Sequence, residues 1–167
     1  ASFTGLDVRG PGFSPGTFSI TATYSGQSTT SSVFTIYARA DSLVWATPPA
    51  ASGTQLEDAA LSTQPIVHVL DANSVVISAG PHSTRTVTIT KTTGPAVVLT
   101  GASLSTGGNG IASFTALRFD RQGTYTLEAS IGAPAITSPA TASFQVHGTP
   151  TSIVFGTQPS TTVAAFE

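Results

Sequence analysis

The sequence contains no cysteine and no methionine, and only 8% of its 167 residues carry a charged side chain. Without cysteine there are neither disulfide bonds nor cysteine-ligated metal sites, so a folded unit must be held together by packing alone. Basic side chains are few and the net charge is −2, which leaves no basic stripe for electrostatic binding of nucleic acid. The composition therefore excludes a disulfide-stapled scaffold and a nucleic-acid-binding protein.

Hydroxyl groups take the place of charge in this sequence. It holds 49 serine and threonine residues together with 16 glycines and 11 prolines. This composition is typical of secreted and cell-surface proteins, and it offers many hydroxyls for O-glycosylation. No apolar run is long enough to cross a membrane, and no Asn-x-Ser/Thr sequon occurs. We expect an extracellular or cell-surface location, with an export signal or anchor elsewhere on a longer parent chain.

The sequence also repeats itself with a period of about 110 residues. Phe34 and Phe144 are 110 positions apart, and so are Ser42 and Ser152. The first pair belongs to a match between residues 1–36 and 112–146, and the second to a match of Ser-Leu-Val-Trp-Ala-Thr-Pro-Pro with Ser-Ile-Val-Phe-Gly-Thr-Gln-Pro. Two independent segments with one offset indicate a tandem array of modules.

The offset predicts where each module begins and ends. We expect residues 1–38 to be the C-terminal part of one repeat, residues 41–147 a complete repeat, and residues 150–167 the first strand of a following repeat. The joints then fall at residues 37–41 and 147–151, and both are short and free of Gly/Ser runs. Such joints favour a semi-rigid rod over a flexible chain.

Alternating apolar and polar residues predict β-strands, and no segment shows helical periodicity with a cap. Residues 17–22, 86–90, 124–128 and 143–146 show this alternation most clearly, with many β-branched and aromatic side chains. The predicted strands of the complete repeat are 42–47, 64–70, 74–78, 84–91, 96–100, 110–119 with a break, 123–130 and 140–147. Short strands at even spacing predict an all-β sandwich. The expected core is Leu43, Trp45, Val67, Val69, Val87, Ile89, Phe114, Leu117, Tyr125, Leu127, Phe144 and Val146.

The order of several short segments resembles the Ig-like repeats of large bacterial adhesins and secreted surface proteins. The matching segments are residues 47–49 and 157–159 (Thr-x-Pro), 67–73 (Val-His-Val-Leu-Asp-Ala-Asn), 110–117 (Gly-Ile-Ala-Ser-Phe-Thr-Ala-Leu), 123–127 (Gly-Thr-Tyr-Thr-Leu) and 143–146 (Ser-Phe-Gln-Val). The family often has glycine after the Asp-Ala-Asn segment, where this sequence has Ser74. The resemblance implies an all-β fold of Ig-like antiparallel β-sandwich modules in tandem, serving as spacers, stalks or adhesive surfaces.

Few residues are candidates for metal binding or catalysis. Asp71, in Asp-Ala-Asn-Ser, is a weak candidate for calcium binding, and Glu57, Asp58 and Asp120 are the other candidates. The favoured interpretation is that Asp71 caps a turn. His68, His82 and His147 are the only histidines, and their spacing does not suggest a metal site. We expect no metal, no cofactor and no catalytic residues, since neither a nucleophile elbow nor an acid/base carboxylate pair is present.

Three further segments have structural interpretations. The glycine-rich residues 107–110 are expected to form a hairpin turn and not an anion cradle, because the Lys-Ser/Thr and helix of a phosphate loop are missing. Trp45 aligns with Phe155 and is expected to be a core or joint residue and not a sugar-stacking platform. The charged residues 118–121 (Arg-Phe-Asp-Arg) are expected either to form a weak surface ion pair or to contact a neighbouring module.

These observations favour a structural module of a large cell-surface repeat protein, such as a stalk, filament or adhesin rod. The alternatives are a glycan- or protein-binding adhesion module and an accessory β module of a secreted enzyme. The expected partners are neighbouring repeats of the same chain, with other copies in a filament, a glycan or a surface protein as further candidates. A fold alone does not choose among these functions.

Overall fold

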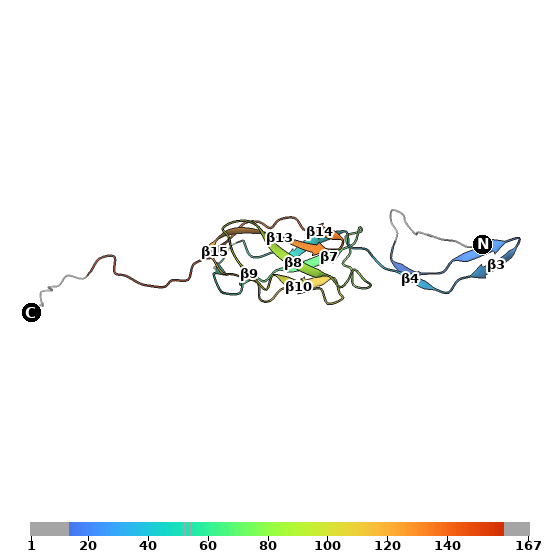
Figure 1. The fold of residues 1–167 in the computed structure, drawn as a ribbon, viewed down its shortest axis with the longest axis horizontal. Helices are drawn as coiled ribbons and strands as arrows, with labels where there is room; N and C mark the ends of the chain where they lie inside the picture. The colour runs from blue at the N-terminus through green and yellow to red at the C-terminus, as the bar shows by residue number, and fades with distance from the viewer. Residues whose placement is uncertain (1–13, 52, 54, 159–167) are drawn as a thin grey trace, which may run out of the picture.

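The computed structural model describes residues 14–51, 53 and 55–158. Within these residues the chain is all-β, with several antiparallel sheets and no helix, and hence no helix long and apolar enough to cross a membrane. Figure 1 shows packed strands over residues 42–147, which we call the central unit, with a hairpin on the N-terminal side and an extended segment on the C-terminal side. Residues 1–6, which match the sequence that begins at residue 112, lie outside the described part, and so does the end of the segment predicted for 150–167.

One sheet of the central unit has the order β11-β7-β5. Its strands are β5 (Ser42–Thr47), β7 (Ile66–Leu70) and β11 (Ile111–Ser113), and all pairings are antiparallel. The alternation in β7 places Val67 and Val69 in the interior, while His68 lies half-buried on the other face. The period-two pattern of the sequence therefore sets which face is buried.

The other sheet has the order β10-β8-β13-β15-β6, and β14 pairs with β13 beside this path. Its strands are β6 (Gln55–Leu56), β8 (Thr86–Thr93), β10 (Ser103–Ser105), β13 (Gly123–Gly132), β14 (Ala135–Thr137) and β15 (Phe144–His147). The pairings are antiparallel except that β6 runs parallel to β15. The long strand β13 anchors this sheet, since it pairs with β8, β14 and β15.

Residues 99–105 pair with two different sheets along their length, and we call them the sheet-changing segment. β9 (Leu99–Thr100) pairs with β12 (Arg118–Phe119), whereas β10 pairs with β8. Gly101 lies between them with φ +72°, and a Cβ there would come within 2.5 Å of the Ala116 carbonyl oxygen. Only glycine adopts this backbone conformation beside another backbone without strain.

A single hydrophobic core fills the space between the two sheets, which gives the central unit a sandwich-like character. Residues from β5 and β7 and from β8, β13 and β15 belong to one buried cluster. The rings of Phe119, Tyr125 and Phe144 pack on one another, with centroids 4.7–6.4 Å apart. The predicted core is confirmed for all of its members but Trp45, which is only half-buried against the cluster. Phe119, Leu61, Ile77 and Ile131 are further core residues that the prediction omitted.

The N-terminal part forms two hairpins, β1 (Gly16–Phe18) with β4 (Phe34–Ile36) and β2 (Thr21–Tyr24) with β3 (Gln27–Thr30). In β1–β4, Gly16 lies opposite Ile36 and Phe18 opposite Phe34. In β13–β15, Gly123 lies opposite Val146 and Tyr125 opposite Phe144. The two antiparallel pairs thus have the same register at matching sequence positions.

The predicted strands differ from the observed ones in three places. Residues 74–78 form no continuous strand but one isolated bridge, Leu70 to Val76, because the Asp71 side chain binds the Val75 amide at the start of this segment. The strand predicted at 96–100 is reduced to β9, since residues 94–98 lead into the sheet-changing segment. Residues 148–158 form no strand, and none of the described segments pairs with them as β7 pairs with β5. The rest of the strand predicted within 150–167 lies outside the described residues. The short strands β6, β10 and β14 were not predicted.

Candidate functional site

Asp71 follows β7 and is the one residue that the sequence singled out as a weak metal candidate. Its Oδ1 accepts hydrogen bonds from the backbone amides of Asn73 and Val75, each at 2.9 Å, and the residue is 8% exposed. The Asp71 amide donates to the Val75 carbonyl, which closes the same loop. This is the hydrogen-bond pattern of an Asx turn. Oδ1 of the carboxylate is therefore engaged by the backbone of the turn.

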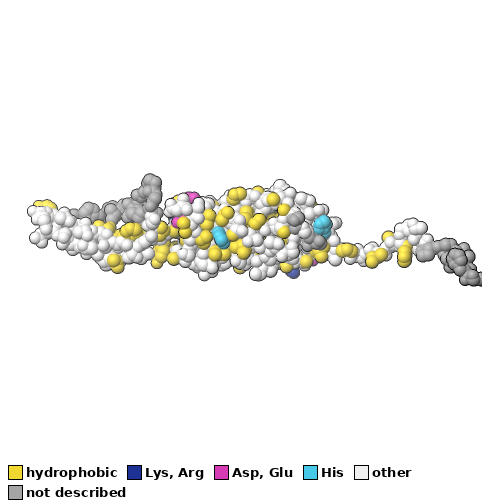
Figure 2. Space-filling model, turned by 180° about the vertical axis from the view of Figure 1, so that it is seen from behind, with side chains coloured by type: hydrophobic (Ala, Val, Ile, Leu, Met, Phe, Trp, Pro, Cys, Tyr) yellow, Lys and Arg dark blue, Asp and Glu magenta, His cyan; other side chains and the backbone are white. Residues whose placement is uncertain are grey.

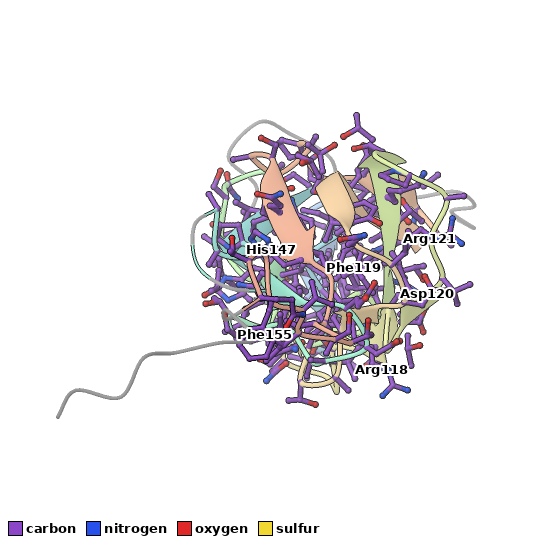
Figure 3. The ribbon with its side chains drawn as sticks, turned by 90° about the vertical axis from the view of Figure 1, so that its left-hand side faces the viewer. Arg118, Phe119, Asp120, Arg121, His147 and Phe155 are labelled. Atoms are coloured by element: carbon purple, nitrogen blue, oxygen red, sulfur yellow. The ribbon has the colours of Figure 1, made fainter. Side chains whose placement is uncertain are left out.

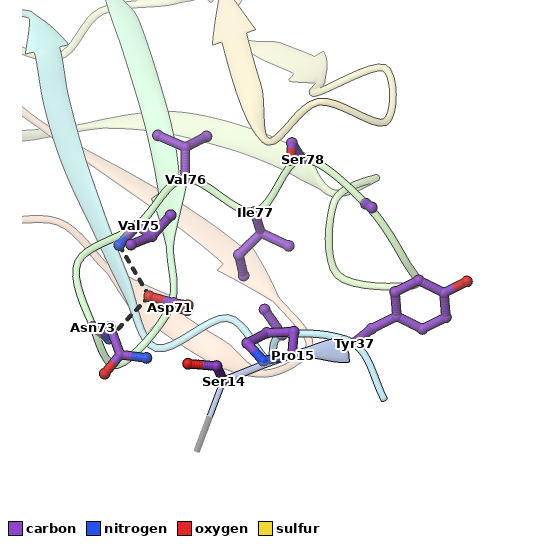
Figure 4. A pocket seen from close by; sticks show the side chains of 11 residues that line it. Ser14, Pro15, Tyr37, Asp71, Asn73, Val75, Val76, Ile77 and Ser78 are labelled. Atoms are coloured by element: carbon purple, nitrogen blue, oxygen red, sulfur yellow. Dashed lines mark hydrogen bonds between the residues drawn. The ribbon is translucent and has the colours of Figure 1, made fainter. Parts of the chain in front are cut away.

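A pocket of about 330 Å³ lies beside this turn. Its walls come from Ser14 and Pro15, from Tyr37 and Ala38 in the joint, and from residues 71–79 (Figure 4). The lining is mostly apolar, and in Figure 4 the Tyr37 ring borders one end while the Asp71 turn borders the other. The pocket marks the place where the N-terminal part meets the central unit.

The three histidines lie apart in the fold, and within the described residues no three His, Cys, Asp or Glu side chains gather as a metal site would need. His68 lies in the middle of β7, and His147 ends β15. His82 lies in the loop before β8, where its Nδ1 accepts a hydrogen bond from the Ala40 amide at 3.1 Å. Burial, together with the charges of Arg85 and Arg39, lowers the pKa of His82 below its usual value.

The glycine-rich residues 107–110 form a turn, as predicted, but not the predicted hairpin turn, because β10 pairs with β8 and β11 pairs with β7. The Asn109 side chain accepts from the Ile111 amide at 3.0 Å, and the Gly110 amide donates to the Ser83 carbonyl at 3.1 Å. The Asn109 amide donates to the Thr106 carbonyl. These two backbone amides are thus directed at carbonyl groups of the protein.

The charged segment 118–121 lies at the end of the unit from which the C-terminal segment leaves (Figure 3). Phe119 points into the core, while Arg118, Asp120 and Arg121 lie on the periphery. The Asp120 carboxylate accepts from the Val98 amide at 2.8 Å, so it holds the sheet-changing segment in place. This role was not among the two that the sequence suggested for the segment.

The second joint is held by Glu57. One carboxylate oxygen accepts from the Thr149 amide and the other from the Gln122 amide, each at 3.1 Å. The Glu57 amide itself donates to the His147 carbonyl at 2.9 Å. Glu57, which the sequence offered as a calcium candidate, fastens the joint to the preceding unit. Both it and His82 were missed as joint residues because their partners are distant in sequence.

On the face seen in Figure 2, few side chains are charged, and hydrophobic side chains lie among uncharged polar ones. Ser103, Thr88, Ser130 and Thr137 lie opposite one another on adjacent strands, so a row of hydroxyls crosses four strands. Thr88 and Ser103 share a hydrogen bond of 3.0 Å. Such a surface offers hydrogen-bonding groups without a charge of either sign.

Exposed aromatic side chains lie at the two ends of the chain. Tyr24 is 86% exposed on the N-terminal hairpin, Tyr37 is 50% exposed in the first joint, and Phe155 is 73% exposed in the C-terminal segment. Trp45, by contrast, packs against the core and donates from its indole nitrogen to the Pro139 carbonyl at 2.9 Å. Its structural role was predicted, whereas Phe155 at the matching position has no such neighbour among the described residues.

We compared the chain with known protein families, curated proteins and solved structures. The chain matches no family model, no curated protein and no solved structure. The fold and surface define a sandwich-like all-β protein with many exposed hydroxyl groups and few charges.

Proposed function

We propose that this chain is part of a large extracellular or cell-surface repeat protein, in which Ig-like sandwiches in tandem form a stalk, filament or adhesin rod. The role is mechanical: each unit buries its own core, and the joints set the stiffness between units. Binding of neighbouring repeats of the same chain is part of this role. Catalysis is not.

The observation that carries the proposal is the shared register of β1–β4 and β13–β15. The sequence match alone relates residues by type, whereas the register relates them by backbone pairing. Because a slip of one residue would turn every side chain to the other face, equal register at matching positions supports a common module.

The strand order supports an Ig-like arrangement. In chain order and pairing, β5, β7, β9 and the broken segment β11–β12 correspond to the A, B, D and E strands of an Ig sandwich, and β8, β13 and β15 correspond to C, F and G. The Tyr125 hydroxyl at the start of β13 donates to the Arg121 carbonyl at 2.8 Å. This is the geometry of a tyrosine corner, which is a mark of Ig-like sandwiches.

The surface supports an extracellular role. Exposed hydroxyls with few charges suit a secreted protein and give substrates for O-glycosylation. The exposed aromatic residues Tyr24, Tyr37 and Phe155 belong to the hairpin, the joint and the C-terminal segment, where an adjoining repeat would cover them.

Force spectroscopy on a chain that carries residues 42–151 twice in series tests the proposal. Two separate unfolding events are expected, each releasing roughly 350–400 Å of chain for about 110 residues. A single event, or two events of very different length, would show that the 110-residue period is not a folding unit. Glycan-array binding by the same protein would favour the adhesion module instead of the stalk.

Protease treatment of intact cells of the source organism tests the location. Release of peptides from this chain without cell lysis is expected of a surface protein. Release only after lysis would contradict the extracellular assignment.

A further inference from the structure

The first joint, residues 37–41, is fastened to the loop before β8 at two points. A methyl group at Gly80 would overlap the Tyr37 ring, so the ring lies directly on that glycine. Three residues further along the chain, the Ala40 amide donates to Nδ1 of His82 at 3.1 Å. Ala40 is 4% exposed, so its amide has little access to water as an alternative partner.

The bond between Ala40 and His82 exists only while the imidazole is neutral. Nδ1 accepts a hydrogen bond in the neutral ring, but both ring nitrogens are donors in the protonated ring. Protonation would therefore place an N–H group against the Ala40 amide and leave a buried donor without an acceptor. An unsatisfied buried donor is strongly unfavourable, so the joint must move away from the ring or lose the bond.

The charges around His82 act in the same direction. Arg85, at the start of the β8 region, and Arg39, in the joint itself, are the charged groups that act on the ring. Both repel a proton on the imidazole, and a protonated ring would in turn repel Arg39 and with it the joint. Acidification thus breaks the hydrogen bond between Ala40 and His82 and adds a repulsion between His82 and Arg39 at the same place.

We propose that protonation of His82 at acidic pH breaks its hydrogen bond with Ala40 and releases the joint, so that the N-terminal hairpin becomes free to swing relative to the central unit. We call this contact the His82 latch. The latch depends on contacts within this chain and does not require the proposed stalk function to be correct.

The second joint cannot carry the same latch. The residue 110 positions after Ala40 is Pro150, which has no amide hydrogen to donate. That joint is held from its other side by Glu57, whose carboxylate accepts from the Thr149 amide. The Ala40–His82 bond therefore has no counterpart at the second joint.

Distance measurements by electron spin resonance on the full chain test the latch. The sequence has no cysteine, so Ser28→Cys on β3 and Thr90→Cys on β8 place two spin labels at exposed positions without side reactions. The expected distance distribution is narrow at about pH 7.5 and at least roughly twice as broad at about pH 4, a low pH that is needed because the pKa of His82 lies below the ordinary histidine value. Trp45 fluorescence at both pH values reports that the central unit stays folded.

Two variants separate His82 from other titrating groups. His82→Asn keeps an acceptor near the place of Nδ1 but does not titrate, so its distribution should stay narrow at both pH values. His82→Leu removes the acceptor and should be broad at both. His68 and His147 remain in these variants, so broadening of His82→Asn on acidification would assign the effect elsewhere and overturn the proposal. An unchanged wild-type width, or a narrow His82→Leu, would overturn it as well.

Discussion

At the scale of single residues, Tyr125 joins the core to the loop before β13. Its ring packs against Phe119 and Phe144, and its hydroxyl donates to the Arg121 carbonyl. Tyr125→Phe keeps the ring and removes the donor, so we expect a loss of about 1–2 kcal/mol in the free energy of unfolding. Urea unfolding followed by Trp45 fluorescence measures it. A change below about 0.5 kcal/mol would mean that the corner adds nothing to stability.

The same hydroxyl predicts a pH dependence. Burial, and secondarily the charge of Asp120, raises the pKa of Tyr125 above its usual value. As the pH rises, the unfolded chain loses this proton before the folded chain does. The stabilisation that the Tyr125 hydroxyl gives the folded state is therefore complete below about pH 10 and decreases as the pH rises through the folded-state pKa. The wild type should lose stability in this alkaline range more steeply than Tyr125→Phe. Parallel curves for the two proteins would contradict the assignment.

Ser74 lies in the Asp71 turn, where its amide donates a hydrogen bond to the Asp71 carbonyl at 2.9 Å. Its φ of +62° lies in the left-handed region, which disfavours residues with a Cβ. Ser74→Gly should raise the free energy of unfolding by up to about 1 kcal/mol, since it relieves this strain at some cost in chain entropy. Ser74→Ala keeps the Cβ and serves as the control, with little change expected. A less stable Ser74→Gly protein would show that the serine is not strained.

At the scale of elements, Gly101 allows one segment to pair with β12 through β9 and with β8 through β10. Gly101→Ala combines a positive φ with a clash against the Ala116 carbonyl, so we expect a loss of roughly 2–4 kcal/mol. Gly107→Ala is the matched control, because its φ is +62° but nothing lies within 4 Å of an added Cβ. The difference between the two in urea unfolding isolates the clash. Equal losses would mean that the sheet change tolerates a side chain.

The elements also show what the sequence could predict. The alternation in β7, β8 and β13 placed the buried face correctly, because burial on one face leaves a period of two in the sequence. β6, β10 and β14 have two or three residues each, too few to display any period. The Asp71 turn was predictable from residue type, since Asp binds nearby amides. The role of His82 was not, because its partner Ala40 is 42 positions away.

At the scale of the whole molecule, the core has a clear extent along the chain. Every buried hydrophobic residue of the cluster lies between Ala40 and Val146. The N-terminal hairpins add half-buried and exposed side chains to the described surface but no member of this cluster. Stability should therefore be concentrated in the central unit, as in repeat proteins whose modules fold individually.

A fragment of residues 38–151 tests this distribution. It keeps the complete core cluster, the Glu57 contact with Thr149 and the Ala40–His82 bond, while it loses the Tyr37 ring that lies on Gly80. We expect its free energy of unfolding to lie within about 1 kcal/mol of that of the full chain, with a similar dependence on urea. Trp45 fluorescence reports both proteins, because it is the only tryptophan. A fragment that is unfolded, or less stable by more than about 2 kcal/mol, would mean that the hairpins and the C-terminal segment are part of the same cooperative unit, and the division into modules would be wrong.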